Sequence, residues 1–244
     1  MNPQNEFHLS LSLRPFGTRW EDLDTDFSAP RPFVVTDVLN RCTTSDLDVE
    51  DLWNLTAGTR ISALLALSSL GGKREFDTDF ICRQCGLAVE VTLGIEELLR
   101  LSPSESCVVI SSEGGTARYR LPTGQDQREW LQYAGENEEQ MRSRILASLC
   151  VEGKAKPESV DAALDAADPL IRGGVTAVCP DCGCPHEMNV DLAGAALARL
   201  EGQQRSLLEG VHLLATHYHW SEAEIFALPA WRREHYLGLL RWGQ

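Results

Sequence analysis

The sequence Cys82-Arg83-Gln84-Cys85-Gly86 recurs, with two changes, as Cys179-Pro180-Asp181-Cys182-Gly183, and the chain is best interpreted from this pair of motifs. A Cys-x-x-Cys turn presents two thiolates to one metal, and Zn²⁺ prefers four such ligands in a tetrahedron. A glycine after the second cysteine suits the left-handed backbone of a zinc knuckle. The two motifs therefore predict one structural zinc ion per chain, bound by Cys82, Cys85, Cys179 and Cys182.

The residues around each motif support a zinc knuckle over a redox site. An extended, alternating segment precedes and follows both motifs, and a helical stretch comes next, so the order strand, knuckle, strand, helix occurs twice. A redox Cys-x-x-Cys normally opens a helix. Four thiolates also leave no open position for a catalytic water. Cys184 and His186 lie close enough to the second motif to replace one of its ligands.

The long segment between the motifs is compatible with one shared ion. Closing a loop of this length costs about 4 kcal/mol, whereas a structural zinc supplies roughly 10–16 kcal/mol of apparent binding free energy. We therefore expect a split four-cysteine zinc ribbon that joins two distant halves of the chain.

Composition excludes several classes of protein. The chain has 244 residues, of which 43% are hydrophobic and 24% charged, as in ordinary soluble proteins. With 36 acidic against 22 basic residues the net charge is −14, and no basic surface is expected to bind nucleic acid. No signal peptide and no apolar run long enough for a membrane span are recognisable, so we expect a cytoplasmic protein that binds no membrane. In that compartment the eight cysteines indicate metal and free thiols rather than disulfides.

Periodicity predicts an α+β fold that is mostly helical. A strand is expected over His8–Arg14 and a β-hairpin from Cys107–Ser112 and Thr116–Leu121. Helices are expected at Val34–Arg41, Val49–Leu55, Thr59–Leu70, Ile95–Leu101, Gln125–Tyr133, Glu136–Leu149, Pro157–Ala166, Asp191–Thr216 and Ala230–Arg241, with a short one that ends before Pro229. Three parts follow: an N-terminal half with the first knuckle (1–102), a second half with the second knuckle (103–200) and a C-terminal helical module (201–244).

The two halves also resemble each other. Leu13–Gly17 is similar to Arg120–Gly124, and Asp37–Cys42 is similar to Ile145–Cys150. Helices and a knuckle follow in both cases, which is the pattern of a diverged internal repeat. In such a repeat each half donates two thiolates, and the metal lies near a pseudo-twofold axis.

The C-terminal segment is the second informative stretch. Ser221 and Glu224 form a capping box that begins a short helix. The surrounding composition is that of a protein-binding surface, for which the candidates are Trp220, Trp231, Arg232, Arg233 and Tyr236. The alternative is a helical hairpin that packs onto the core.

The histidines of this segment allow a further alternative. His212, His217 and His219 could bind a second, catalytic metal, but they equally suit packing against Trp220. No phosphate loop, dinucleotide fingerprint, nucleophile elbow or metalloprotease motif is present elsewhere. We therefore expect no enzymatic activity.

The order of motifs in the first half points to a family. The motifs are, in order, Asp37–Cys42, Val49–Leu52, Leu55–Arg60, Leu64–Leu67 and Cys82–Gly86. A helix that ends in cysteine, an acidic turn, a helix start with glycine and arginine, and Cys-x-x-Cys-Gly resemble, in this order, the T-even phage baseplate hub assembly proteins of contractile-tailed phages. Residues 219–237, with His-Trp-Ser-Glu, Leu-Pro, Arg-Arg and Tyr-Leu, resemble a short helical module encoded in phage tail and contractile injection system gene clusters.

The resemblance covers residues 33–100 and 168–240, and the chain departs from the family pattern at the N-terminus and in carrying a second knuckle. It implies a structural or assembly protein whose partners are hub, spike or wedge proteins of a contractile tail, acting in the producing cell or retained in the particle. Two alternatives stay open: a zinc-ribbon adaptor or regulator that binds protein or nucleic acid, and a metal-dependent hydrolase.

Overall fold

The computed structural model describes residues 11–103, 105–112, 115–135 and 137–242. The α-helices are α1 (Arg31–Cys42), α2 (Val49–Asn54), α3 (Ala57–Leu70), α4 (Ile95–Leu99), α5 (Gly124–Trp130), α6 (Glu138–Leu149), α7 (Pro157–Ala167), α8 (Pro169–Arg172), α9 (Leu192–Tyr218), α10 (Glu222–Ala227) and α11 (Ala230–Trp242). The strands are β1 (Glu75–Ile81), β2 (Ala88–Gly94), β3 (Cys107–Ser112), β4 (Gly115–Arg120), β5 (Cys150–Glu152), β6 (Gly174–Val178) and β7 (Pro185–Asn189), and two short 3₁₀ helices are η1 (Trp20–Asp24) and η2 (Leu131–Tyr133).

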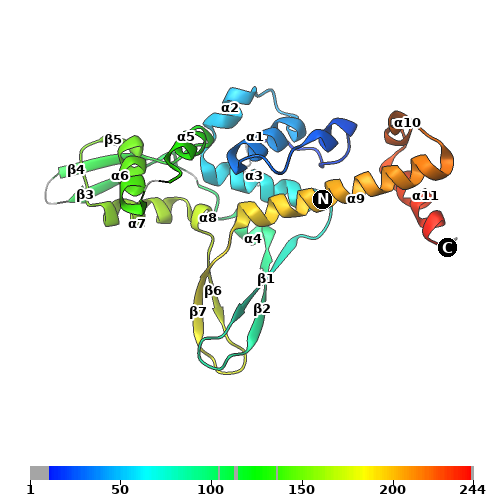
Figure 1. Cartoon of the computed structure of the whole chain (residues 1–244). Coiled ribbons are helices and arrows are strands. Elements are labelled where there is room, and N and C mark those ends of the chain that lie inside the picture. Colours follow the sequence, from blue (N-terminus) through cyan, green and yellow to red (C-terminus); the bar gives the residue numbers. More distant parts are fainter. Residues whose placement is uncertain (1–10, 104, 113–114, 136, 243–244) are drawn as a thin grey trace, which may run out of the picture.

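Four parts of the molecule are distinguished in Figure 1. The body contains α1–α5 and the first half of α9. The arm consists of the antiparallel hairpins β1–β2 and β6–β7, which lie side by side and project away from the body. The lobe contains the three-stranded sheet β3–β4–β5 with α6 and α7, and the module contains the second half of α9 with α10 and α11, at the opposite end of the molecule.

The body has the largest buried cluster, and both halves of the chain contribute to it. Val38 and Leu39 of α1 and Leu64 of α3 are fully buried, and Ala196 and Leu200 of α9 pack with them. Residues 170–200, which the sequence analysis assigned to the second half, pack in this core with the first half, whereas residues 108–167 pack in the lobe. The lobe has its own smaller core.

Backbone hydrogen bonds join the lobe to the body. The N–H of Ala57 donates to the carbonyl of Pro122 (2.7 Å), and the N–H of Gly124 donates to the carbonyl of Leu55 (3.1 Å). A carboxylate oxygen of Asp168, between α7 and α8, accepts the N–H of Gly58 at the start of α3 (2.9 Å). The lobe is thus held at the N-terminal end of the central helix.

A matching pair of ion pairs relates the two halves. Arg14 makes two 2.7 Å hydrogen bonds to Asp22 and also donates to the carbonyl of Arg41 at the end of α1. Arg120 binds Asp126 through both guanidinium nitrogens and donates to the carbonyl of Ser148 near the end of α6.

The β-pairings relate the two halves in the same way as these ion pairs. Leu13 bridges to Thr43 as Tyr119 pairs with Cys150. In the structure Thr43 is therefore the equivalent of Cys150. The sequence similarity had aligned Cys42 with Cys150, one residue away.

The predicted helices and the predicted hairpin are present, and α9 ends at Tyr218, where His219 takes a left-handed φ of 56°. Sequence reasoning missed the short elements η1, α8 and β5. Of the strand expected over 8–14, residues 8–10 lie outside the described residues, and Leu13 forms only the single bridge. In the described residues, no helix combines the length and apolar composition that crossing a membrane requires.

Candidate metal centre

Both knuckles lie at the tip of the arm and have the same backbone geometry. In the first, the N–H of Cys82 donates to the carbonyl of Leu87 (2.8 Å) and the N–H of Gly86 donates back to that of Cys82 (2.9 Å). In the second, Cys179 with Cys184, and Gly183 with Cys179, repeat these bonds at 3.0 Å. Gly86 and Gly183 have φ values of 77° and 71°, which a residue with a Cβ rarely adopts.

This geometry brings the four predicted cysteines together. The Sγ atoms of Cys82 and Cys182 are 3.6 Å apart, as are those of Cys85 and Cys179. All four sulfurs lie within 4.8 Å of one another. A tetrahedral ion with metal–sulfur bonds of about 2.3 Å requires sulfurs about 3.8 Å apart. The cluster fits such an ion, and its separations are far longer than a disulfide bond of about 2.05 Å.

The electrostatics of the thiols also favour a cation at this position. The backbone N–H of Cys85 is the main cause that lowers the pKa of the Cys82 thiol to about 5. For Cys85 the N–H of Leu87 favours the thiolate, but burial and the neighbouring thiols outweigh it and raise the pKa to about 12. Four crowded thiols cannot all ionise without a compensating positive charge, which a divalent metal would supply.

The residues around the sulfurs are supporting groups rather than ligands. The Nε2 atom of His186 lies 3.2 Å from the Cys82 sulfur, and the His186 ring packs against Phe80 with centroids 4.7 Å apart. Groups outside the ligand set that hydrogen-bond to a ligand orient it toward the metal. The thiol of Cys184 is directed to the carbonyl of Pro185. The four-cysteine set predicted from the motifs is therefore the one that the geometry selects.

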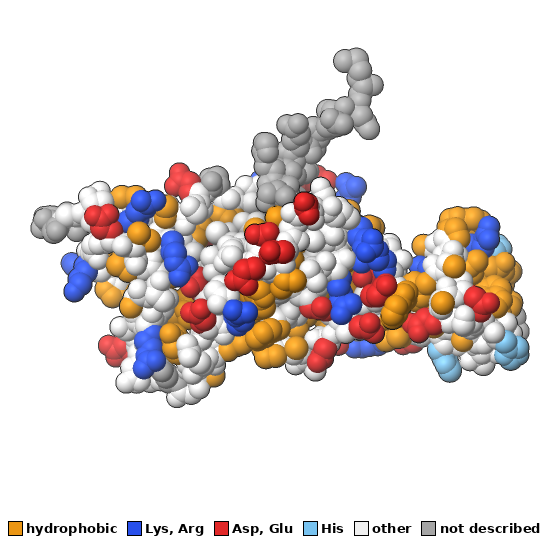
Figure 2. Space-filling view, turned by 90° about the horizontal axis from the view of Figure 1, so that it is seen from above, with side chains coloured by type: hydrophobic (Ala, Val, Ile, Leu, Met, Phe, Trp, Pro, Cys, Tyr) orange, Lys and Arg blue, Asp and Glu red, His pale blue; other side chains and the backbone are white. Residues whose placement is uncertain are grey.

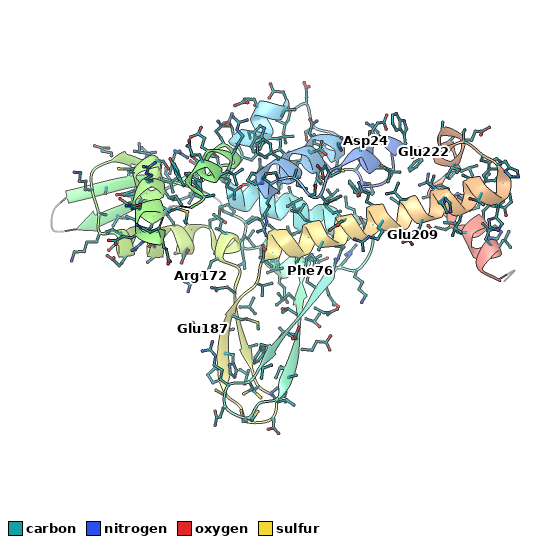
Figure 3. The ribbon with its side chains drawn as sticks, in the orientation of Figure 1. Asp24, Phe76, Arg172, Glu187, Glu209 and Glu222 are labelled. Atoms are coloured by element: carbon teal, nitrogen blue, oxygen red, sulfur yellow. The ribbon has the colours of Figure 1, made fainter. Side chains whose placement is uncertain are left out.

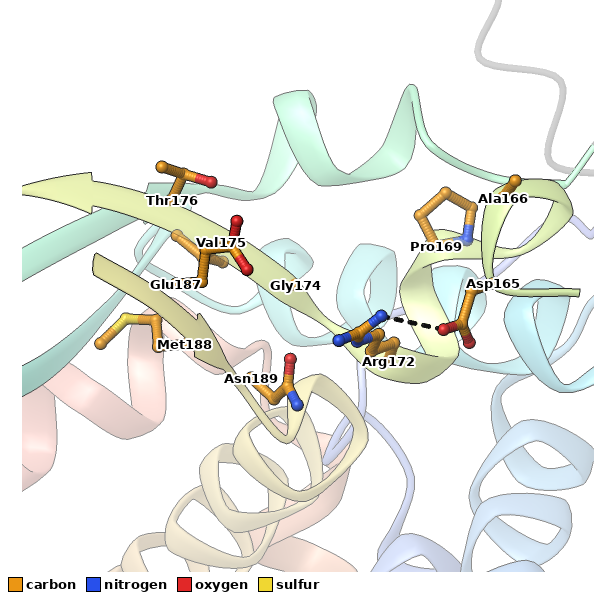
Figure 4. A pocket seen from close by; sticks show the side chains of 10 residues that line it. All are labelled: Asp165, Ala166, Pro169, Arg172, Gly174, Val175, Thr176, Glu187, Met188 and Asn189. Atoms are coloured by element: carbon orange, nitrogen blue, oxygen red, sulfur yellow. Dashed lines mark hydrogen bonds and ion pairs between the residues drawn. The ribbon is translucent and has the colours of Figure 1, made fainter. Parts of the chain in front are cut away.

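The arm is anchored to the body at its root. Phe76 lies where β1 leaves the body, and the Arg199 guanidinium of α9 stacks over its ring at 4.0 Å (Figure 3). Glu187 lies in the middle of β7, between the root and the tip of the arm (Figure 3). A polar cavity of about 490 Å³ lies beside β6 and β7, where Arg172 pairs with Asp165 at 3.0 Å (Figure 4). The contact between Arg199 and Phe76 therefore joins the root of the arm to α9.

The C-terminal histidines do not form a second metal cluster among the described residues, where the four cysteines are the only group placed to share an ion. Histidine side chains gather on the surface of the module (Figure 2). The Nδ1 atom of His217 lies 3.1 Å from the carbonyl of Leu213 in its own helix, and His219 caps that helix.

The candidate partner-binding residues divide into two groups. Trp220 and Tyr236 form an aromatic cluster with Tyr218, with ring centroids 4.7–5.4 Å apart, inside the module. Arg233 is only 8% exposed and donates to the carbonyls of Phe226 and Leu228 at the end of α10. Trp231 is 67% exposed, and Arg232 lies over its ring. Trp231 and Arg232 are therefore the members available to a partner.

Sequence analysis did not identify two buried charged residues, Arg60 and Asp168, that connect parts of the scaffold. Arg60 is 1% exposed, and its guanidinium donates to the carbonyls of Leu52 and Pro32. Burial lowers its pKa to about 10. Asp168 is also 1% exposed, and burial raises its pKa to about 6. The Gly-Thr-Arg motif in the first turn of α3 was a signal for Arg60, but no local pattern indicated Asp168.

Comparisons with protein-family models, with curated proteins and with solved structures gave no match for this chain.

Proposed function

We propose that this chain is a non-enzymatic structural or assembly protein of the baseplate of a contractile phage tail or tail-like injection system. The ion at the tip of the arm is structural Zn²⁺, one per chain, which staples two distant segments together. The chain acts in the cytoplasm of the producing cell, either as an assembly factor or as a subunit that stays in the particle.

The observation that carries the proposal is the order of the motifs between Asp37 and Gly86 and their place in the fold. Gly58 and Arg60 lie at the start of the central helix, where Arg60 is buried and Gly58 contacts Asp168. These motifs therefore specify the scaffold. The knuckle presents a rigid arm instead of an open catalytic site, because all four coordination positions are taken by sulfur.

Docking would use the exposed end of the module. An exposed tryptophan with an arginine stacked on it has the composition of an interface anchor, and Trp231 is 67% exposed. The net charge of −14 favours partners with basic surfaces and disfavours nucleic acid. It thereby favours the baseplate proposal over the nucleic-acid-binding form of a zinc-ribbon adaptor.

The test is co-expression with the hub, spike and wedge proteins of a contractile tail, followed by affinity purification of the chain. We expect one of these proteins to be retained by the wild type and lost from a Trp231→Ala/Arg232→Glu variant. Trp20→Ala removes another tryptophan, 50% exposed, and serves as the matched control. Retention of none of these tail proteins would refute the proposal, whereas equal retention by both variants would refute only the docking surface.

A further inference from the structure

An open backbone edge at the extended segment Leu11–Arg14 becomes visible when the body is compared with the lobe. In the lobe, Tyr119 of β4 has strand neighbours on both sides, Val108 of β3 and Cys150 of β5. Its counterpart in the body, Leu13, has a neighbour on one side only, Thr43. The body therefore has an equivalent of the β4–β5 pairing but, among the described residues, no equivalent of β3.

The hydrogen bonds show which way the open edge faces. The backbone N–H of Arg14 donates to the carbonyl of Cys42 (2.9 Å), and the carbonyl of Ser12 accepts the N–H of Thr44 (2.8 Å), so the backbone groups of Ser12 and Arg14 point toward residues 42–44. Backbone groups alternate in direction along a strand, so those of Leu11 and Leu13 point to the other side. Within the described chain, these groups have no hydrogen-bond partner.

An apolar groove of about 410 Å³ lies at this edge. It is lined by Leu11 and Leu13 from the extended segment Leu11–Arg14, Leu70 from α3, and Ile95 and Leu99 from α4. Leu70 is 48% exposed there. In the lobe, β3 occupies the corresponding edge of β4, and its Val108 is buried in one core with Val160 of α7.

We propose that this groove accepts an extended segment of another protein, which pairs with Leu11–Arg14 as an added strand. The segment has apolar residues at alternating positions, as β3 has Val108 and Ile110. Strand addition of this kind obtains affinity from main-chain hydrogen bonds and specificity from the pockets for alternate side chains. The Arg74–Glu96 pair (3.0 Å) balances the charge at the rim of the groove, so apolar contacts dominate recognition.

The chain's own first residues do not match this requirement. With the hairpin spacing of the lobe, the positions of Val108 and Ile110 correspond to Asn2 and Gln4, whose side chains are polar amides. An incoming strand from a partner would supply the missing apolar contacts. The proposal goes beyond the baseplate assignment and does not depend on it.

The experiment uses the full-length, isotope-labelled protein and a synthetic peptide of residues 105–112 with Cys107→Ser as the strand probe. We expect saturable binding and at least about tenfold slower hydrogen exchange at the Leu13 amide, with that of Arg14 unchanged. A peptide that also carries Val108→Asn and Ile110→Gln should bind at least about tenfold more weakly.

Two protein variants locate the binding site. Leu70→Arg should weaken binding of the probe at least about tenfold. Leu208→Arg, on α9 at a residue that is 46% exposed, is the matched control and should bind normally. The proposal is overturned if the Leu13 amide is already protected in the free chain, if both peptides bind alike, or if Leu70→Arg binds as well as the wild type. Protection that depends on protein concentration would instead identify a second copy as the occupant, and would also overturn it.

Discussion

At the scale of single residues, Asp168 places a buried carboxylate at the joint between lobe and body. One carboxylate oxygen accepts the N–H of Gly58 at 2.9 Å, and the other has no hydrogen-bond partner. Burial raises the pKa from 3.8 to about 6, although the N–H groups of Gly58 and Leu170 oppose the shift. A Cβ on Gly58 would lie 1.9 Å from the unpartnered oxygen, so only glycine permits this approach.

The raised pKa predicts a stability that depends on pH. A group whose pKa is higher in the folded state stabilises the fold fully below its unfolded pKa, and this contribution is lost as the pH rises through the folded value. For Asp168 the window lies between pH 3.8 and about 6. Asp168→Asn removes the titration, and the free energy of unfolding of the variant should rise relative to the wild type by up to about 3 kcal/mol across this window.

Urea unfolding of both proteins at several pH values measures this difference. Asp165→Asn is the control, because its side chain is 44% exposed and pairs with Arg172. A difference between Asp168→Asn and the wild type that is constant from pH 4 to pH 7 would contradict the prediction.

The shared metal site predicts a result that depends on which cysteines are removed. Cys82→Ser/Cys179→Ser removes one thiolate from each knuckle, and bound zinc should fall from about one equivalent to none. Cys107→Ser/Cys150→Ser removes two cysteines of the lobe and should retain the metal. Elemental analysis of the purified proteins gives the stoichiometry. Two equivalents in the wild type, or metal retained by the first variant, would exclude a single shared ion.

At the scale of elements, the sequence predicts what is local and misses what is not. The knuckle hairpins follow from a cysteine spacing, a glycine and a short alternation, all within one segment. The strand β5 has three residues, and its existence depends on β4, from which α5, η2 and α6 separate it in the sequence. The periodicity of α9 indicates an apolar face but cannot show that Ala196 and Leu200 complete the core of the first half. A match between Cys42 and Cys150 likewise concealed a register in which Thr43 is the true counterpart of Cys150.

The module offers a prediction about one helix end. Arg233→Ala leaves the carbonyls at the end of α10 without their donor and should destabilise the module by about 1–3 kcal/mol. Arg232→Ala removes a neighbouring arginine that lies over the exposed Trp231 ring, and should change stability by less than about 0.5 kcal/mol. Hydrogen exchange of α10 amides reports the difference. Equal protection of α10 in the two variants would show that Arg233 does not hold the module together.

At the scale of the whole molecule, the metal centre and the main core are separate. The two knuckles connect the strands at the tip of the arm (Figure 1), and only a small cluster with Phe80, Val89 and Val91 packs beside their cysteines. The body has its own core, to which the arm contributes Phe76 and Leu93, with Val91 and Val175 packed against it. The metal therefore fixes the arm without being needed for the packing of the body.

Removal of the metal should loosen the arm and leave the body folded. A two-stranded hairpin is marginal by itself in water, and without the ion the two hairpins of the arm keep only the small cluster around Phe80 in common near the tip. We expect chelation to increase hydrogen exchange in β1, β2, β6 and β7, while α1 and α3 stay protected, because their buried leucines and valines belong to the core of the body and not to the cluster beside the knuckles. Addition of zinc should restore the protection of the arm, and the Cys82→Ser/Cys179→Ser variant should resemble the chelated protein before and after the addition. If chelation instead exposed the amides of α1 and α3 together with those of the arm, the ion would be part of one cooperative folding unit, and the body could not be described as an independent scaffold.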